Sequence, residues 1–478
     1  MSWPYAAIFE SADGKHHGLK PTGLQLARIG ARRSAWQILR HAKFRRYFIG
    51  SLISNFGTWL QNTAQVLLTY QLTHSVLAIG LVTTAQFSGS LILGPFAAKM
   101  ASHVGGKRTL IGTQAASAVI ALGMAGLARA GLLHEGWLIL GALLLGLAFT
   151  FALPIQTALV PRLVSAADTE AAMAMNSVSY NAGRALAPAL SVLVIVTAGF
   201  RWAFFINAIS FLIFAVMLTT IHPAREKLPR QVAHARDGLV ETLKRPRIML
   251  WLAMVAAVTF ADDPILILGP AVALSIPGAS NDWAGYFLSA LGMGTVLGSL
   301  QPTRRARRAT PSYSTKRAAW SLLLLAVAIG FFAAGLNKWV SLGAAFAAGV
   351  AALRTGAVTQ TELVRRHPER TASVMALWAI AWAGTKPIAS FLDGYLASTI
   401  GIWFAVAVLT SFAIVLALFE IFLPEGKKKS IRVRARAAGT KLGKRIEAQG
   451  IEAQKSNIDV SPADAPADLM VPTGAGIK

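Results

Sequence analysis

Long apolar runs divide the chain at nearly regular intervals. Each run is long enough to cross a bilayer as a helix of about 20 residues, and the runs lie near 47–71, 76–100, 109–131, 137–160, 171–197, 201–221, 248–275, 283–303, 317–336, 339–362, 372–397 and 401–424. A polar, basic segment separates the first six from the last six. The pattern predicts an all-α integral membrane protein with twelve transmembrane helices in two six-helix bundles.

The same pattern sets the boundaries that we expect for the parts of the chain. They are a basic N-terminal tail, a first bundle, a basic linker, a second bundle and a C-terminal tail, at 1–46, 47–221, 222–247, 248–424 and 425–478. The C-terminal tail begins with a basic stretch and continues with sequence rich in Ala, Pro and Asp, which is typical of disorder.

Composition excludes most other classes of protein. Of the 478 residues, 54% are hydrophobic and 14% charged, against about 25% charged in soluble domains, so a soluble enzyme is excluded. There is no cysteine, and the nine histidines are dispersed through tails and loops, which predicts no metal site. No Gly-Lys-Ser/Thr phosphate loop occurs. We therefore expect a protein that is not an enzyme, carries no cofactor and has no ATPase of its own.

The excess of cations predicts an orientation in the membrane. The net charge is +25; on a soluble protein this would suggest nucleic acid, but here it lies in tails and loops, where anionic lipids are the expected partner. The tail to Arg46 holds nine Lys and Arg, the linker seven, the loop between helices 8 and 9 six, and the C-terminal tail eleven. The opposite side holds only Arg129, Arg201 and Lys338. The positive-inside rule then places both termini in the cytoplasm.

The two halves of the chain also resemble each other. Leu91–Gly94 falls opposite Thr295–Gly298, and Gln156-Thr157 opposite Gln360-Thr361, both at an offset of 204 residues. Weak symmetry between two six-helix halves is typical of a duplicated transporter fold.

Four segments carry a resemblance to a known family. They are FRRYFIGSLISNFGTWLQ (44–61), LILGPFAAKM (91–100), ALPIQTALVPRLV (152–164) and AMNSVSYNAGRALAPAL (174–190). In their order and spacing the chain resembles the major facilitator superfamily, in its enterobactin-exporter and macrolide-efflux-like branch. The resemblance implies a monomeric transporter in the inner membrane of a bacterium, which exports a small molecule by alternating access.

The loop between helices 2 and 3 departs from that family. There the superfamily usually carries an Asp followed by basic residues, which form a gating latch. Here Ser102 stands in place of the Asp and His103 in place of the first basic residue, while Lys107 and Arg108 are retained. The usual latch is therefore expected to be weakened or replaced.

Adjacent carboxylates near the middle of helix 7 are the strongest candidates for chemistry. A carboxylate in hydrocarbon costs several kcal/mol, so Asp262 and Asp263 should face a cavity or bear a proton. Their mutual repulsion favours proton binding by one of them, which makes protons an expected partner. Pro264 follows, so Asp263 could cap the half-helix beyond it. The alternative is a hydrated helix break near the outer mouth.

Intramembrane cations form a second candidate group. Arg184 in helix 5 and Lys386 in helix 11 lie at similar depths, and each needs a carboxylate, a carbonyl or an anionic substrate as a partner. Arg184 could equally tie helix 5 to a neighbour. Asp393 lies two turns beyond Lys386, and we expect it to be solvated near the outer end.

Polar residues at helical spacing complete the expected cavity. Helix 1 carries Asn55, Thr58, Asn62 and Gln65 on one face, which predicts a cavity or a contact with another helix. Helix 5 adds Asn176, Tyr180 and Asn181.

These patterns together predict a secondary active exporter of a small organic molecule, working by proton-coupled antiport. Two cations in the cavity favour an anionic, siderophore-like cargo. The alternatives are broad multidrug efflux and a non-transporting membrane sensor or scaffold, the latter motivated by the missing Asp in the loop between helices 2 and 3.

Overall fold

The computed structural model describes residues 35–104, 106–165, 168–222, 242, 245–299, 311–367 and 371–422. This part of the chain is helical throughout and contains no β-strand. Most of the basic tails and of the predicted linker lie outside the described residues, so the structure gives no account of them.

Six long helices form the first half. They are α2 (Ala42–Thr73), α3 (Val76–Val104), α4 (Gly106–Arg129), α5 (Glu135–Leu159), α6 (Thr169–Ala198) and α7 (Phe200–Thr219). A short 3-10 helix, η1 (Ala35–Arg40), precedes them and packs on α2 and α6. Folded structure therefore begins inside the segment that the sequence analysis assigns to the N-terminal tail.

The second half repeats this pattern with two of its spans interrupted. Its continuous helices are α12 (Trp283–Ser299), α14 (Pro311–Ala333), α15 (Lys338–Arg366) and α18 (Ile402–Phe422). The seventh span is divided into α9 (Pro246–Asp262), α10 (Pro264–Ile267) and α11 (Gly269–Ser275). The eleventh is divided into α16 (Thr371–Ala379), a π-helical turn η5 (Ile380–Gly384) and α17 (Lys386–Ile400).

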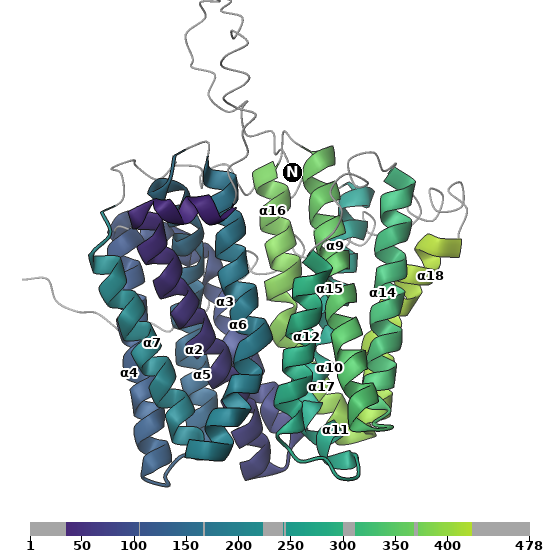
Figure 1. The fold of residues 1–478 in the computed structure, drawn as a ribbon. Helices are drawn as coiled ribbons and strands as arrows, with labels where there is room; N and C mark the ends of the chain where they lie inside the picture. Colours follow the sequence, from purple (N-terminus) through teal and green to yellow (C-terminus); the bar gives the residue numbers. More distant parts are fainter. Residues whose placement is uncertain are drawn as a thin grey trace, which may run out of the picture. The chain divides into compact units, whose positions relative to one another are not determined.

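The described residues thus contain twelve spans, two of them divided, as predicted. Figure 1 shows α2–α7 gathered together and α9–α18 gathered beside them. Among the described residues, eight helices are long and apolar enough to cross a membrane. The others are shorter or divided, or carry more polar residues.

Small side chains are frequent in the helix contacts of the second half. Buried alanines recur along α15 and α18, among them Ala345, Ala348, Ala405 and Ala413. Between membrane helices no hydrophobic driving force acts, so close van der Waals packing through small residues stabilises the bundle. The membrane-spanning part is therefore held together by shape rather than by large apolar side chains alone.

Candidate functional site

A cavity lies between the two bundles at the level of the broken helices. It comprises about 1000 Å³ of empty space, part of it open to solvent. Its walls come from α2, α3 and α6 of the first half and from α9, α10, α12, η5 and α17 of the second. Both halves must therefore contribute to whatever binds there.

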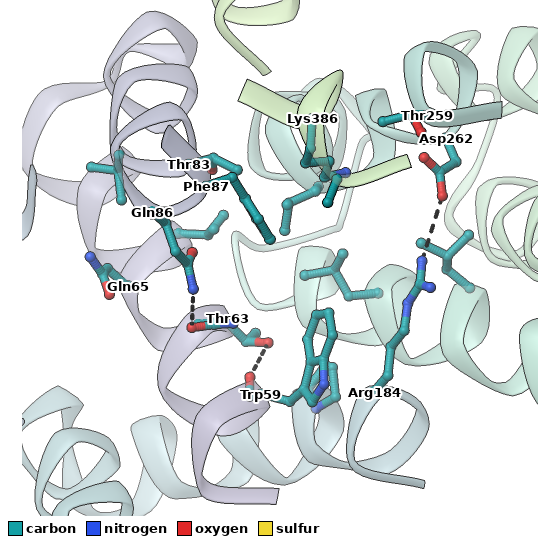
Figure 2. Close-up of a pocket in the computed structure, with 18 of the residues that line it drawn as sticks. Trp59, Thr63, Gln65, Thr83, Gln86, Phe87, Arg184, Thr259, Asp262 and Lys386 are labelled. Atoms are coloured by element: carbon teal, nitrogen blue, oxygen red, sulfur yellow. Dashed lines mark hydrogen bonds and ion pairs between the residues drawn. The ribbon is translucent and has the colours of Figure 1, made fainter. Parts of the chain in front are cut away.

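An ion pair crosses the cavity from one half to the other. The Arg184 guanidinium on α6 lies 3.5 Å from a carboxylate oxygen of Asp262 at the end of α9. The two side chains are 20% and 12% exposed, and Figure 2 shows them directed toward each other. The guanidinium also lies 5.8 Å from the centre of the Trp59 ring, within reach of a cation–π attraction.

A second, more deeply buried pair joins two helices of the second half. Lys386 is in ion-pair contact with Asp263, whose side chain is completely buried. Ser390 donates a hydrogen bond of 2.5 Å to the other oxygen of the Asp263 carboxylate. The adjacent carboxylates thus serve different cations, because Asp262 faces the cavity and Asp263 faces α17.

The expectation that Asp263 caps the following half-helix is wrong. Asp263 has helical backbone angles and makes no side-chain hydrogen bond to the start of α10, because Lys386 and Ser390 occupy both of its oxygens. The helix break itself is present at Pro264.

The expectation of a solvated Asp393 is also wrong. Its side chain is completely buried, and neither carboxylate oxygen has a hydrogen-bond partner in the described part of the chain. The reason is that α17 is packed against several helices at once, namely α3, α18, α9 and α10.

The polar residues of α2, the first predicted span, divide between the cavity and helix packing. Asn62 and Gln65 line the cavity; Asn62 accepts a hydrogen bond from Gln86, and Gln65 donates one to the Leu138 carbonyl. Thr58 instead donates to a carbonyl of its own helix. Asn55 donates to Ser179 on α6, at 3.0 Å.

The polar residues of α6, the fifth predicted span, divide in the same way. Tyr180 lines the cavity and packs edge-on against Trp59, with ring centres 5.8 Å apart. Asn176 accepts a hydrogen bond of 3.1 Å from Tyr47, and Asn181 donates to the Ser177 carbonyl on its own helix.

The connection between α3 and α4, the second and third predicted spans, is only partly described. The side chains of Ser102 and His103 lie outside the described structure. Lys107 donates a hydrogen bond of 3.0 Å to the Thr219 carbonyl at the end of α7, where the helix dipole favours a cation. Arg108 is exposed.

Aromatic side chains of the cavity wall escaped the sequence analysis. Trp59, Phe87 and Trp382 all line the cavity, and Trp382 stacks on Trp378 at a ring distance of 6.2 Å. The sequence does not show whether an aromatic residue inside an apolar run faces a cavity or the lipid, although Trp59 lies one helical turn from Asn62. Gln86 could have been found, because it is a polar residue within an apolar run.

Contacts between the two halves lie beside the cavity and on one side of it. We call the two ends of the bundle the terminal end, where α2 begins and α18 ends, and the far end. Gly80 of α3 meets Ser390 and Gly394 of α17 toward the far end, and Asn281 donates to the Leu67 carbonyl there. The far end is therefore closed around the cavity.

This geometry agrees with comparisons with known proteins. The model of the Major Facilitator Superfamily matches residues 47–386, which is well over half of the chain, so the protein belongs to this superfamily. It is accordingly a multi-pass membrane transporter rather than an enzyme.

Individual relatives are more distant. The chain is 25% identical to the enterobactin exporter EntS of Shigella boydii serotype 18 over 306 residues, which cover 62% of this chain and 70% of the relative. The Escherichia coli O9:H4 (strain HS) protein of the same name matches with the same figures.

Solved transporters share the fold at low identity. The nucleoside transporter NupG aligns with a TM-score of 0.64 and 12% identity, covering 79% of this chain and 98% of the other. A D-xylose–proton symporter aligns at 0.62 and 17% identity, covering 81% and 98%. A bacterial homologue of the lysosomal transporter Spinster, in an inward-facing and unoccupied conformation, aligns at 0.61 and 14% identity, covering 79% and 96%.

Proposed function

We propose that this protein is a proton-coupled exporter, which moves a small amphiphilic organic molecule out of the cytoplasm by alternating access. The observation that carries the proposal is the cavity shared by both halves, crossed by the ion pair between Arg184 and Asp262. A charged contact between two moving bundles links the charge state of the cavity to their relative position.

Aromatic and charged groups together define the chemistry of the cargo. Trp59, Tyr180 and Trp382 offer flat apolar surfaces, and Arg184 offers planar, bidentate hydrogen bonding to carboxylate or catecholate oxygens. This combination fits an anionic aromatic compound of the siderophore type. The similarity to enterobactin exporters supports the same class of cargo.

Asp262 is our candidate for the coupling proton. It is slightly exposed to the cavity, and its contact with Arg184, at 3.5 Å, is a long one. Protonation of Asp262 would break its ion pair with Arg184, which joins the two halves. Asp263, held by Lys386 and Ser390, would position α17 instead.

The proposed setting is the inner membrane of a bacterium, with the terminal end and both tails in the cytoplasm. The bias of Lys and Arg supports this orientation, and the basic tails suit contact with anionic lipids. We propose a monomer, because the cavity is complete within one chain.

Transport into inside-out vesicles tests the proposal. Purified protein is reconstituted, and the uptake of iron-free enterobactin and of ethidium, a cationic dye, is followed with and without a pH gradient. Gradient-driven uptake of enterobactin alone supports siderophore export, and uptake of both compounds supports multidrug efflux, which the aromatic wall would also suit. Uptake of neither, by monodisperse protein, favours a sensor or scaffold and refutes the proposal.

A further inference from the structure

Arg354 is a cation within a membrane-spanning helix that neither ion pair of the cavity uses. It lies in α15, about 18 Å from the end of that helix at Arg366, at 1.5 Å per residue. Its Nε atom is buried and has no hydrogen-bond partner among the described residues. Glu362, the acid of the same helix, is already shared by Arg365 and Arg366. Because a charged side chain inside a membrane needs a partner or water, the Arg354 guanidinium is available to a ligand.

The contacts of α15 show which side of the helix carries Arg354. Leu353 faces α12, where a Cβ built on Gly298 would lie 3.4 Å from the Leu353 Cβ. Ser341 donates a hydrogen bond to a carbonyl of α14, and the Arg366 guanidinium lies 5.5 Å from the centre of a tryptophan ring of α9. At about 100° per residue, Arg354 is turned about 140° from Ser341 and lies between the sides that meet α12 and α9. Both of those helices are walls of the cavity, so Arg354 is on the cavity side of α15.

The depth of Arg354 follows from α12, because this helix contacts both halves. Gly292 of α12 packs directly against the backbone of Arg184 on α6. Gly298, which meets Leu353, lies six residues farther along α12 toward the terminal end, or about 9 Å at the rise of an α-helix. The backbone of Arg354 is therefore about 9 Å nearer the terminal end than that of Arg184, and it belongs to the other half.

A stacked pair of tryptophans leads from the cavity in the same direction. Trp382 lines the cavity, and Trp378 lies one helical turn nearer the terminal end, with its ring plane 14° from that of Trp382. The Nε1 donor of Trp378 is buried and has no partner in the described part of the chain. Trp378 belongs to α16, which packs on α15. On the terminal side of the cavity the second half therefore offers a flat aromatic surface together with N–H donors that are not in use.

We propose that Arg354 is a second anion site, which binds one anionic group of the cargo on the terminal side of the cavity while Arg184 binds another. The ligand that fits both is an elongated aromatic dianion, with an anionic group at each end and rings between them. Arg184 has to give up Asp262 to bind an anion, whereas the acid of α15 is held by other arginines. An anion that enters from the terminal end therefore meets Arg354 first. The inference rests on the proposed function and adds a second binding site to it.

Two rod-shaped compounds test the second site. Biphenyl-4,4′-dicarboxylate carries a carboxylate at each end and biphenyl-4-carboxylate at only one, and isothermal titration of the full chain in detergent measures the affinity for each. The native protein should bind the dicarboxylate about tenfold more tightly, or by about 1.4 kcal/mol, because a second charge-assisted hydrogen bond is formed.

Arg354→Gln should bind the two compounds within about twofold of each other, since either end of the dicarboxylate can still meet Arg184. Its affinity for the monocarboxylate should be unchanged, which also shows that the variant is folded. Arg354→Lys should keep part of the preference, because the charge is retained. Arg129→Gln, the same change at an exposed position of the far end, should keep all of it.

Several results would overturn the inference. They are native protein that binds both compounds equally or binds neither, a preference that survives Arg354→Gln, and monodisperse Arg354→Gln protein that no longer binds the monocarboxylate. The transport assay is decided separately. A preference that depends on Arg354, in a protein that moves neither enterobactin nor ethidium, refutes export and keeps the second site. Gradient-driven export with the same preference in native and Arg354→Gln protein does the reverse.

Discussion

Neighbouring acids in this transporter have different environments, and these decide what each can do. Asp263 is fully buried against Lys386 and Ser390, whereas Asp262 reaches the cavity and Arg184. A buried pair adds little stability compared with apolar residues of equal size, but removal of one partner strands the other charge. The fully buried pair of Asp263 and Lys386 should therefore matter for folding, and the partly exposed pair of Asp262 and Arg184 for transport.

Asp263→Asn is expected to lower the free energy of unfolding by roughly 3–5 kcal/mol, because Lys386 then lacks its carboxylate. Asp263→Asn combined with Lys386→Met should recover most of this loss. Thermal unfolding in detergent measures both, with Asp282→Asn as the control. Equal losses in the single and double variants would contradict the pairing.

Arg184→Lys should weaken the binding of enterobactin while preserving the fold, because Lys keeps the charge but loses the planar fork. Arg184→Ala should nearly abolish export. Affinity is measured in detergent on protein of verified monodispersity. Unchanged affinity in well-folded Arg184→Ala protein would show that Arg184 only ties α6 to α9.

Charged residues could be found from the sequence because they stand out within apolar runs. Asp262, Asp263, Arg184 and Lys386 were all singled out in this way, and the structure brings them together in two pairs. Their pairing could not be predicted, because it depends on how α6, α9 and α17 face one another. Asp393 was misjudged for the same reason, since its burial depends on how the neighbouring helices pack around α17.

Interrupted helices are the distinguishing elements of the fold. Proline removes a backbone donor and clashes with the preceding turn, so the break at Pro264 was predictable. The π-helical turn of Ile380–Gly384 was not, because no residue type marks such turns. Turns of this kind are frequent at functional sites, and this one places Trp382 and Ala383 in the cavity wall.

Gly80→Val should hold the far end open. The added side chain would meet the Ser390 backbone at 2.6 Å, and overpacking of this kind costs about 1–3 kcal/mol, equivalent to about a 5- to 150-fold shift toward the open state. A cysteine at Leu77→Cys, at the start of α3 beside Gly394, should then react faster with a membrane-impermeant maleimide, and export should fall. Gly112→Val, with no neighbouring atom within 4 Å, is the matched control; faster labelling in both variants would point to general destabilisation.

The twelve-span plan of the whole molecule follows from apolar runs and charge. Lipid requires every backbone polar group to be satisfied within the segment, so long apolar runs have to be helices. The cavity follows less directly, because it depends on which helices of the two halves approach each other. Weak repeat symmetry indicated two bundles but carried no information on the closure of the far end.

Orientation can be tested in intact cells. A membrane-impermeant maleimide should label Leu132→Cys at the far end directly, and should label Thr220→Cys at the terminal end only after the membrane is permeabilised. This result is expected because the excess of Lys and Arg lies at the terminal end, which the positive-inside rule places in the cytoplasm. The opposite result would invert the proposed direction of transport.

The salt link between the two halves also makes Asp262 a tethered competitor. Any anion entering the cavity contends for the Arg184 guanidinium with a carboxylate that never diffuses away, so its effective concentration stays high. Asp262→Asn should therefore tighten the binding of enterobactin about five- to tenfold, or about 1–1.4 kcal/mol, while abolishing gradient-driven uptake. Isothermal titration of both proteins measures this, and weaker binding by the variant would exclude competition.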